Sequence, residues 1–414
     1  MRTERLSFER VGCSSAELEA ANLISKEIRE IGAQSRLESF PVSNVRVHKA
    51  ALTALEPQIK EYSVTCFLHS GNTPRGGLIA ELLPVLEVSE VSLANATGKI
   101  ILLSSSHISA DSYIQMRRAG VAGFITMTGS LTDGSDCDLP SPRLSPSLRQ
   151  YGPIPGVNLR MSDGMSLVNS GTSKVKIEVL TESVSLPSQN IIAEIPGTEH
   201  PEEIIVIGAH YDSVEFSCGS YDNGAGCVTI LELLRYFKGN PPARTLRFIW
   251  FGCEELGLLG SHAYLDTHRE TNRQIRFMIN VDLGAIIFGR DMACVSADRN
   301  LMIFLEYLSK ETGFPIEPRF EITSSDCSSF VNAGVPAVSF CRSGLKGSEF
   351  MHSRNDCIRF QSPKALANSI RFILLFTERL VNSVVFPIPR TIPAEIKADT
   401  DRYFQNDPVS LDIT

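Results

Sequence analysis

Two runs of apolar residues that end in ionisable side chains constrain the fold of this chain more than any other feature. One reads IIVIGAH and ends at His210, and the other reads LRFIWF and shortly precedes the adjacent carboxylates Glu254 and Glu255. Short, continuous apolar runs of this kind predict buried strands. A buried charge without a partner is costly, so imidazole and carboxylate groups at strand ends predict a site for divalent zinc or a related metal ion.

Three further ionisable residues extend this pattern. Asp222 stands before a predicted helix in the sequence DNGAG, Asp282 ends the apolar run FMINVD, and His352 lies in the polar segment EFMHS. In sheets whose strands alternate with helices, functional side chains gather beyond the carboxyl ends of the strands. The chain is therefore predicted to be a metal-dependent hydrolase.

Each of these residues taken alone has an ordinary structural explanation. His210 or His352 could be a partly buried histidine, Asp222 could cap a helix, and the glutamate pair could begin a solvated helix that its dipole favours. Asp282 fits such an explanation least well, because a carboxylate follows a fully apolar strand. The metal prediction rests on the whole set in this order.

The flanking residues resemble a known family of enzymes. The segments are GAHYDS around His210, YDNGAG around Asp222, CEELGLLGS from Cys253 onward and NVD ending at Asp282. They resemble the co-catalytic dizinc aminopeptidases, a family that includes bacterial leucyl aminopeptidases, aminopeptidase Y and the glutamate carboxypeptidases. The resemblance covers most of the chain and implies a zinc exopeptidase fold, in which a mixed, mainly parallel sheet is sandwiched by helices.

The resemblance also implies roles for these residues. One zinc ion would be held by His210 and Asp282, a second by Glu255 and His352, and Asp222 would bridge both. Glu254 would be the general base, and Asp212 would orient the ring of His210. The implied activity is that of an aminopeptidase, which hydrolyses N-terminal residues from peptides through a hydroxide that bridges the two metal ions.

The chain departs from the family in two places. Met351 stands where many relatives have a tyrosine that helps to bind the oxyanion, and we expect Arg342 or Tyr221 to replace it, or the metals to carry more of the charge. The family has a histidine at the position of Cys327. The residue before it, Asp326, is interpreted as part of the pocket wall and not as a metal ligand.

Three alternative functions remain open. A carboxypeptidase or dipeptidase would use the same site with a cationic anchor for the substrate carboxylate, for which Arg342 and Lys346 are candidates. A single-zinc enzyme similar to glutaminyl cyclases would transfer acyl groups. A catalytically inactive, receptor-like protein is the third, and the filled metal positions and Glu254 argue against it.

Length and local composition predict two domains. A chain of 414 residues exceeds one typical core. Residues 44–173 are rich in Ser, Pro and Gly and contain the strand GKIILL, a helix and the strand VAGFIT. This segment resembles the smaller, β-rich protease-associated domain that is inserted in related peptidases. The catalytic domain would comprise residues 1–43 and 174–388, and residues 389–414 would form a tail.

Composition limits the partners and the location. The formal net charge of −8 argues against nucleic acid. No apolar run approaches the roughly 20 residues that cross a membrane, and the N-terminus lacks the apolar segment of a signal peptide. The ten cysteines form no CxxC pair and are expected to be reduced. We therefore expect a cytoplasmic enzyme with peptide substrates, and the sequence leaves its oligomeric state open.

Overall fold

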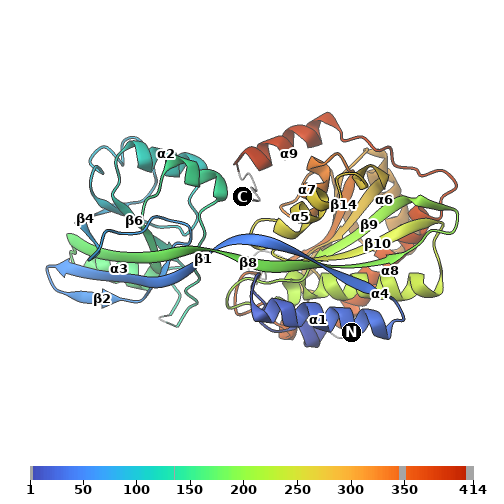
Figure 1. Ribbon diagram of the computed structural model, residues 1–414, viewed down its shortest axis with the longest axis horizontal. Helices are drawn as coiled ribbons and strands as arrows, with labels where there is room; N and C mark the ends of the chain where they lie inside the picture. The colour runs from blue at the N-terminus through green and yellow to red at the C-terminus, as the bar shows by residue number, and fades with distance from the viewer. Residues whose placement is uncertain (1–2, 135, 345–350, 407–414) are drawn as a thin grey trace. The chain divides into compact units, whose positions relative to one another are not determined.

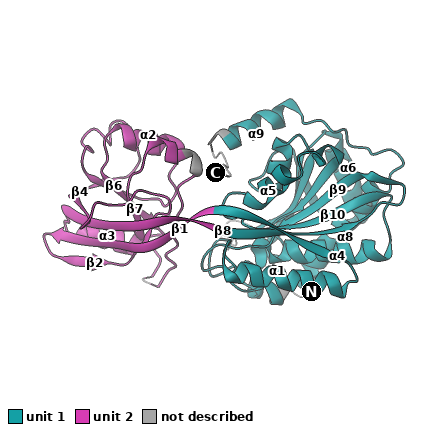
Figure 2. Cartoon of the chain, viewed as in Figure 1, with its two compact units in different colours: residues 1–42, 186–405, 413–414 teal, residues 43–185, 406–412 magenta. Residues whose placement is uncertain are grey.

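The computed structural model describes residues 3–134, 136–344 and 351–406, and these form two compact units (Figure 2). Unit 1 comprises the residues up to Val42 and Leu186–Gln405, and unit 2 comprises Ser43–Ser185 together with Asn406. Unit 2 is therefore built mainly from one continuous segment that is inserted in unit 1.

Unit 1 is built on a mixed sheet. Its strand order is β13-β12-β14-β11-β9-β10-β8. Neighbouring strands are parallel except in the pairs β10–β8 and β12–β14, which are antiparallel. This is the mixed, mainly parallel sheet that the sequence predicts. The strands are β8 (Lys174–Ile195), β9 (His200–His210), β10 (Arg244–Phe251), β11 (Ile275–Val281), β12 (Gly289–Ser296), β13 (Ile316–Arg319) and β14 (Ala337–Gly344).

Helices cover both faces of this sheet (Figure 1). Along β9, Ile205 and Ile207 contribute to the core beneath α1, α4, α6 and α8, whereas Ile204 and Val206 contribute to the core beneath α5, α7 and α9. This alternation follows from the two-residue period of a strand. The helices are α1 (Ser15–Glu30), α4 (Ala225–Gly239), α5 (Leu259–Thr267), α6 (Asn300–Thr312), α7 (Asp326–Asn332), α8 (Pro363–Val381) and α9 (Ala394–Asn406), and the short turns are η1 (Thr3–Leu6), η3 (Ser220–Gly224), η4 (Asn272–Gln274) and η5 (Ile358–Phe360).

Two helix starts that the sequence predicts are confirmed. The Ser14 hydroxyl accepts a hydrogen bond from the amide of Glu17 at the start of α1, and the Ser362 hydroxyl accepts one from the amide of Ala365 at the start of α8. Each cap satisfies an amide that has no partner within its helix. None of the helices in the described part of the chain is long and apolar enough to span a membrane.

Unit 2 has its own sheet and cores. Strands β4, β5, β6 and β7 are parallel neighbours, β3 is antiparallel to β7, and the first part of β8 is antiparallel to β4. The predicted strand–helix–strand sequence corresponds to β5, α2 and β6. The elements are β1 (Ser35–Glu56, which begins in unit 1), β2 (Lys60–Tyr62), β3 (Val64–Cys66), β4 (Leu78–Val85), β5 (Ile100–Leu103), β6 (Gly123–Thr128), β7 (Gly156–Arg160), α2 (Ala110–Arg118), α3 (Met161–Asn169) and η2 (Pro146–Tyr151).

The structure differs from the sequence expectations at two boundaries. Residues 174–185 were assigned to the catalytic domain but lie in unit 2, because β8 pairs there with β4 and buries Val175 and Ile177. Residues 389–414 were expected to be a tail, yet residues 394–406 form α9. Ile396 is fully buried against the core of unit 1 and Ile392 packs against the same core, and so few apolar contacts leave little trace in a polar sequence.

Candidate metal centre

The predicted ligands lie at one edge of the sheet of unit 1. His210 is the last residue of β9, and Glu254 and Glu255 follow the end of β10. Since these parallel strands pair His210 with Phe251, their carboxyl ends lie side by side. Asp282 directly follows β11, which is the neighbour of β9 on the other side. Parallel strands thus deliver side chains that are far apart in sequence to one place.

Two histidines face a shared carboxylate in this cluster. Nε2 of His210 lies 3.0 Å from Oδ1 of Asp222 and 3.3 Å from Oδ1 of Asp282. Nε2 of His352 lies 3.2 Å from Oδ2 of Asp222 and 3.1 Å from Oε2 of Glu255. Each oxygen of Asp222 therefore faces a different histidine, which is the arrangement that a bridging ligand requires.

The spacing and the chemistry of these groups fit zinc. Ligands about 2.0–2.1 Å from a tetrahedral zinc ion lie about 3.3 Å apart, close to the separations above. Oε1 of Glu255 and Oδ1 of Asp282 are buried and make no hydrogen bond within the described residues, although buried polar atoms normally have partners. The ligand atoms of His210, Glu254 and Glu255 also lie within 4.8 Å of one another. Distance alone therefore does not show which of the two glutamates would bind a metal ion and which would act as the general base.

Burial and repulsion between neighbouring carboxylates make Glu254 and Glu255 hard to ionise without a cation. Burial raises the pKa of Glu254 well above its ordinary value, and the neighbouring Glu255 and Asp282 carboxylates act in the same direction. Burial also raises the pKa of Glu255 to about 7. Hydrogen bonds to Asp222 and Glu255 raise the pKa of His352 to about 11. The cluster thus favours positive charge, which a divalent ion would supply.

Asp212 contacts both halves of the cluster. Its Oδ1 lies 3.4 Å from Nδ1 of His210 and accepts a hydrogen bond of 3.0 Å from the amide of Glu254. Its Oδ2 accepts one of 3.2 Å from the amide of Glu255. The sequence suggested only the contact with His210. The fully buried Asp212 side chain also fixes the backbone that carries both glutamates.

Asp356 supports the backbone of Asp222, and sequence reasoning missed it. Its carboxylate accepts hydrogen bonds of 2.6 Å from the amide of Tyr221 and 3.0 Å from the amide of Asp222. Burial raises the pKa of Asp356 to about 6, and these two hydrogen bonds oppose that shift. Asp356 lies in a polar segment, SRNDC, where an acidic residue carries no distinguishing signal.

Arg10 is the second supporting residue that the sequence did not indicate. Its side chain is fully buried and donates hydrogen bonds of 2.7 Å to the carbonyls of Leu6, Cys218 and Gly219, and one to the carbonyl of Tyr211. A weaker one of 3.1 Å goes to the carbonyl of Phe8. Tyr211 precedes Asp212, and Gly219 precedes η3, which contains Asp222. Arg10 therefore joins the N-terminal segment to two backbone segments that carry the cluster.

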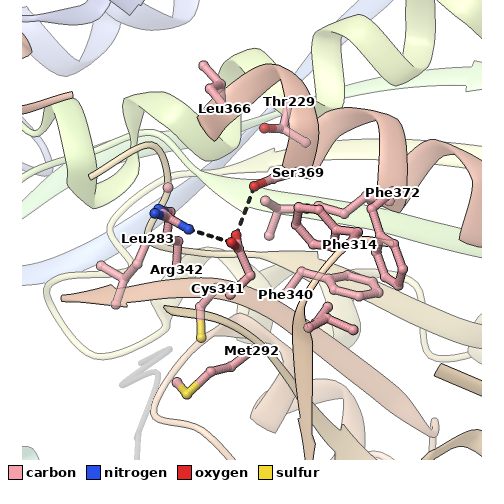
Figure 3. A pocket seen from close by; sticks show the side chains of 15 residues that line it. Thr229, Leu283, Met292, Phe314, Phe340, Cys341, Arg342, Leu366, Ser369 and Phe372 are labelled. Carbon is pink, nitrogen blue, oxygen red and sulfur yellow. Dashed lines mark hydrogen bonds and ion pairs between the residues drawn. The ribbon is translucent and has the colours of Figure 1, made fainter. Parts of the chain in front are cut away.

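The expected substitutes for the missing tyrosine are already engaged. The Tyr221 hydroxyl donates a hydrogen bond of 2.9 Å to the carbonyl of Arg342. The Arg342 guanidinium donates to the carboxylate of Asp291 and to the carbonyl of Ile286, beside an apolar pocket (Figure 3). Neither group is free to bind an oxyanion or a substrate carboxylate, which corrects the sequence expectation. Lys346, the other proposed anchor, lies outside the described residues.

The segment around Asp326 lines the cluster, as its interpretation as pocket wall requires. The Ser325 hydroxyl donates a hydrogen bond of 2.6 Å to Oδ2 of Asp282. Asp326 is fully buried, and burial raises its pKa to about 7. Among the described residues, Asp326 belongs to none of the groups whose spacing would hold a metal ion.

Comparisons with known proteins show similarity to a family of peptidases. The model of the family described as peptidase family M28 matches residues 190–377. Aminopeptidase YwaD of Bacillus subtilis is 27% identical to this chain, and the alignment covers 96% of this chain and 86% of that protein. Carboxypeptidase Q of Mus musculus is 26% identical, with 80% of this chain and 75% of that protein covered. The structure of BSAP, a zinc aminopeptidase from Bacillus subtilis, shares the fold with a TM-score of 0.77 at 24% identity, over 95% of this chain and 97% of that chain.

Proposed function

Residues 190–377 belong to peptidase family M28, and we propose that this metallo-exopeptidase is an aminopeptidase with a two-metal site. The observation that carries the proposal is the shared carboxylate of Asp222, whose two oxygens face His210 and His352 separately. A relative described as an aminopeptidase aligns with nearly the whole chain. The proposed substrates are peptides with a free N-terminus.

The chain offers a complete ligand set for two ions. His210 and Asp282 would hold one ion, Glu255 and His352 the other, and Asp222 both. When bound, a pair of zinc ions lowers the pKa of a water molecule and polarises the scissile carbonyl. The three ligand carboxylates balance most of the charge of two divalent ions, which accounts for their burial in one place.

Glu254 is proposed to move the proton. Its carboxylate would accept the proton of the attacking water and return it to the nitrogen of the leaving amine. Glu254 is buried beside the ligand atoms of His210 and Glu255, within reach of a group bound there. Asp212 would keep this carboxylate in place through the amide of Glu254.

The end of the peptide that is recognised distinguishes the leading proposal from its nearest alternative. A carboxypeptidase or dipeptidase would need a cation for the substrate carboxylate, and the Arg342 guanidinium is already bound to Asp291. The similarity to carboxypeptidase Q keeps this alternative as the second candidate. The two ligand groups that share Asp222 argue against a single-zinc acyl transferase.

A substrate panel and a metal analysis test the proposal together. Aminoacyl peptides should be hydrolysed, peptides with a blocked N-terminus should not, and a chelator should abolish hydrolysis. Elemental analysis should find about two zinc ions per chain, since a single divalent ion leaves one of the three ligand carboxylates uncompensated. Hydrolysis of N-blocked peptides from the C-terminus would favour the carboxypeptidase, and one zinc ion after zinc supplementation would refute the two-metal site.

Unit 2 is proposed to be a protease-associated domain inserted in the peptidase domain. The β5-α2-β6 arrangement and the separate cores of unit 2 support this assignment. No group of residues spaced to hold a metal ion occurs among the described residues of unit 2. Replacement of residues 43–185 by a short linker should therefore leave zinc binding measurable, and a folded variant without zinc binding would contradict the assignment.

The enzyme is proposed to work in the cytoplasm. None of the ten cysteines is paired in a disulfide bond in the structure, and an absence of disulfides is typical of proteins in a reducing compartment. Fractionation of cells that express the untagged chain should recover its activity with the cytoplasmic proteins, and its recovery from the medium would contradict this location.

A further inference from the structure

Two cysteine side chains meet beside the glutamate pair. Cys13 lies in the segment before α1, and Cys253 lies between β10 and Glu254. Although the two residues are far apart in sequence, their sulfur atoms are 3.4 Å apart. The proposed function assigns no role to either thiol.

The backbones that carry these thiols are in close contact. A Cβ atom added at Gly12 would lie 2.7 Å from Sγ and 3.3 Å from Cα of Cys253, so only glycine allows this approach. The Glu17 carboxylate holds both backbones, since Oε2 accepts a hydrogen bond of 2.7 Å from the amide of Cys13 and Oε1 accepts one of 3.1 Å from the amide of Cys253. Disulfides need Cα atoms about 4.4–6.8 Å apart, and the close approach of Gly12 to Cys253 favours such a separation for the neighbouring Cys13.

The two thiols differ in their exposure to solvent. Cys13 is partly exposed, whereas Cys253 is fully buried. Cys13 is therefore the more accessible of the two residues to a small oxidant, and the sulfur of Cys253 lies 3.4 Å from the sulfur that would be oxidised. This is the arrangement in which a reactive thiol is paired with a resolving one.

We propose that Cys13 and Cys253 form an oxidation site that a peroxide converts into a disulfide. One hydrogen peroxide molecule oxidises the Cys13 thiol to a sulfenic acid and leaves its second oxygen as water. The sulfur of Cys253 then attacks the sulfur of the sulfenic acid, the S–S bond forms, and the sulfenic oxygen leaves with the thiol proton as a second water. The Glu17 carboxylate, whose Oε1 lies 3.6 Å from Sγ of Cys253, is placed to relay that proton.

The disulfide would displace the backbone of the glutamate pair. The sulfur atoms must approach from 3.4 Å to about 2.05 Å, and Cys253 is bonded directly to Glu254. Asp212 accepts hydrogen bonds from the amides of Glu254 and Glu255. These bonds oppose the movement of Cys253, so the backbone would distort between Cys253 and Glu255. A misplacement of about 1 Å can lower a rate about 100-fold. This consequence rests on the proposed function, whereas formation of the disulfide does not.

Peroxide treatment of the zinc-loaded full chain tests the proposal. Peptide mapping without reductant should find the peptide of Cys13 linked to that of Cys253, and aminopeptidase activity should fall on the order of 10- to 100-fold. Dithiothreitol should break the link and restore the activity. The link is read by mass alone, so it remains measurable even if the protein hydrolyses none of the peptides offered.

Matched variants separate this site from general oxidation. Cys13→Ser should form no link at Cys253 and should keep its activity in peroxide, with Cys13→Ala as the second variant if serine lowers the melting temperature. Cys137→Ser, which removes another partly exposed thiol, should remain as sensitive as the wild type. Oxidised wild type without the Cys13–Cys253 link would overturn the proposal, and equal inactivation of the Cys13 variants would overturn its effect on the active site.

Discussion

Replacing Arg10 by methionine should loosen the metal centre without touching a ligand. Methionine retains most of the apolar stem of arginine but donates no hydrogen bond. The substitution removes donors to the carbonyls of Tyr211 and Gly219, which precede Asp212 and the turn that contains Asp222. Both backbone segments should therefore become more mobile.

The size of the effect follows from the hydrogen bonds that are lost. Those to the carbonyls of Tyr211, Leu6 and Gly219 are completely buried, and an unsatisfied buried acceptor costs about 1–3 kcal/mol. The wild type also bears the cost of desolvating the guanidinium, whose pKa burial lowers. Since this cost disappears in the variant, we expect the free energy of unfolding of the metal-free protein to fall by about 3–5 kcal/mol. Loss of an outer-shell support typically weakens metal binding about 10- to 100-fold.

A second buried arginine provides the matched control. Arg244 is 2% exposed and binds the Glu203 carboxylate and the carbonyl of Val381. It begins β10, at the end of the strand opposite to Glu254. Arg244→Met should lower the stability to urea as well, but its zinc affinity should stay within about twofold of the wild type, because Arg244 and its partner Glu203 lie at the ends of β10 and β9 that are remote from the ligands.

Urea unfolding in chelator and competitive zinc titration with a chromophoric chelator separate the two effects. Arg10→Met should lose stability and zinc affinity together, and Arg244→Met should lose stability alone. If Arg10→Met bound zinc as tightly as Arg244→Met, the inference that Arg10 positions the metal centre would be wrong, whatever the loss of stability.

Three further predictions concern the cluster itself. Glu254→Gln should retain two zinc ions and lower hydrolysis at least ~100-fold, whereas Glu255→Ala should lose one ion; equal metal contents in elemental analysis would contradict the assigned roles. Asp356→Ala should weaken zinc binding about 10-fold or more, because the amides of Tyr221 and Asp222 lose their acceptor, and an unchanged titration curve would exclude this support. Burial raises the pKa of Glu255 from 4.5 to about 7 in the metal-free protein. Between these pH values the folded state binds more protons than the unfolded state. The free energy of unfolding should therefore fall as pH rises from about 4.5 to about 7. Saturating zinc should suppress this component, and urea midpoints that do not change with pH in chelator would refute it.

The sequence alone determined the framework of the fold and the composition of the candidate site. The apolar runs that end at His210, Phe251 and Val281 specify buried strands, and Ser14 and Ser362 specify helix starts. These signals are local, because strand period, burial and capping act between residues that are close in the chain. The ordered ligand types at strand ends also predicted the cluster, because parallel strands must bring their carboxyl ends to one edge.

Only the tertiary structure decided which groups support the site and which are already engaged. Arg10 meets the carbonyl of Gly219, Asp356 meets the amide of Asp222, and Cys13 meets Cys253, and no periodicity or spacing relates these partners. The same holds for Arg342, whose guanidinium is bound by Asp291 instead of being open to a substrate. A hydrogen bond or an ion pair depends on atomic distance, and for residues far apart in the chain that distance exists only after the sheet and its helices have packed.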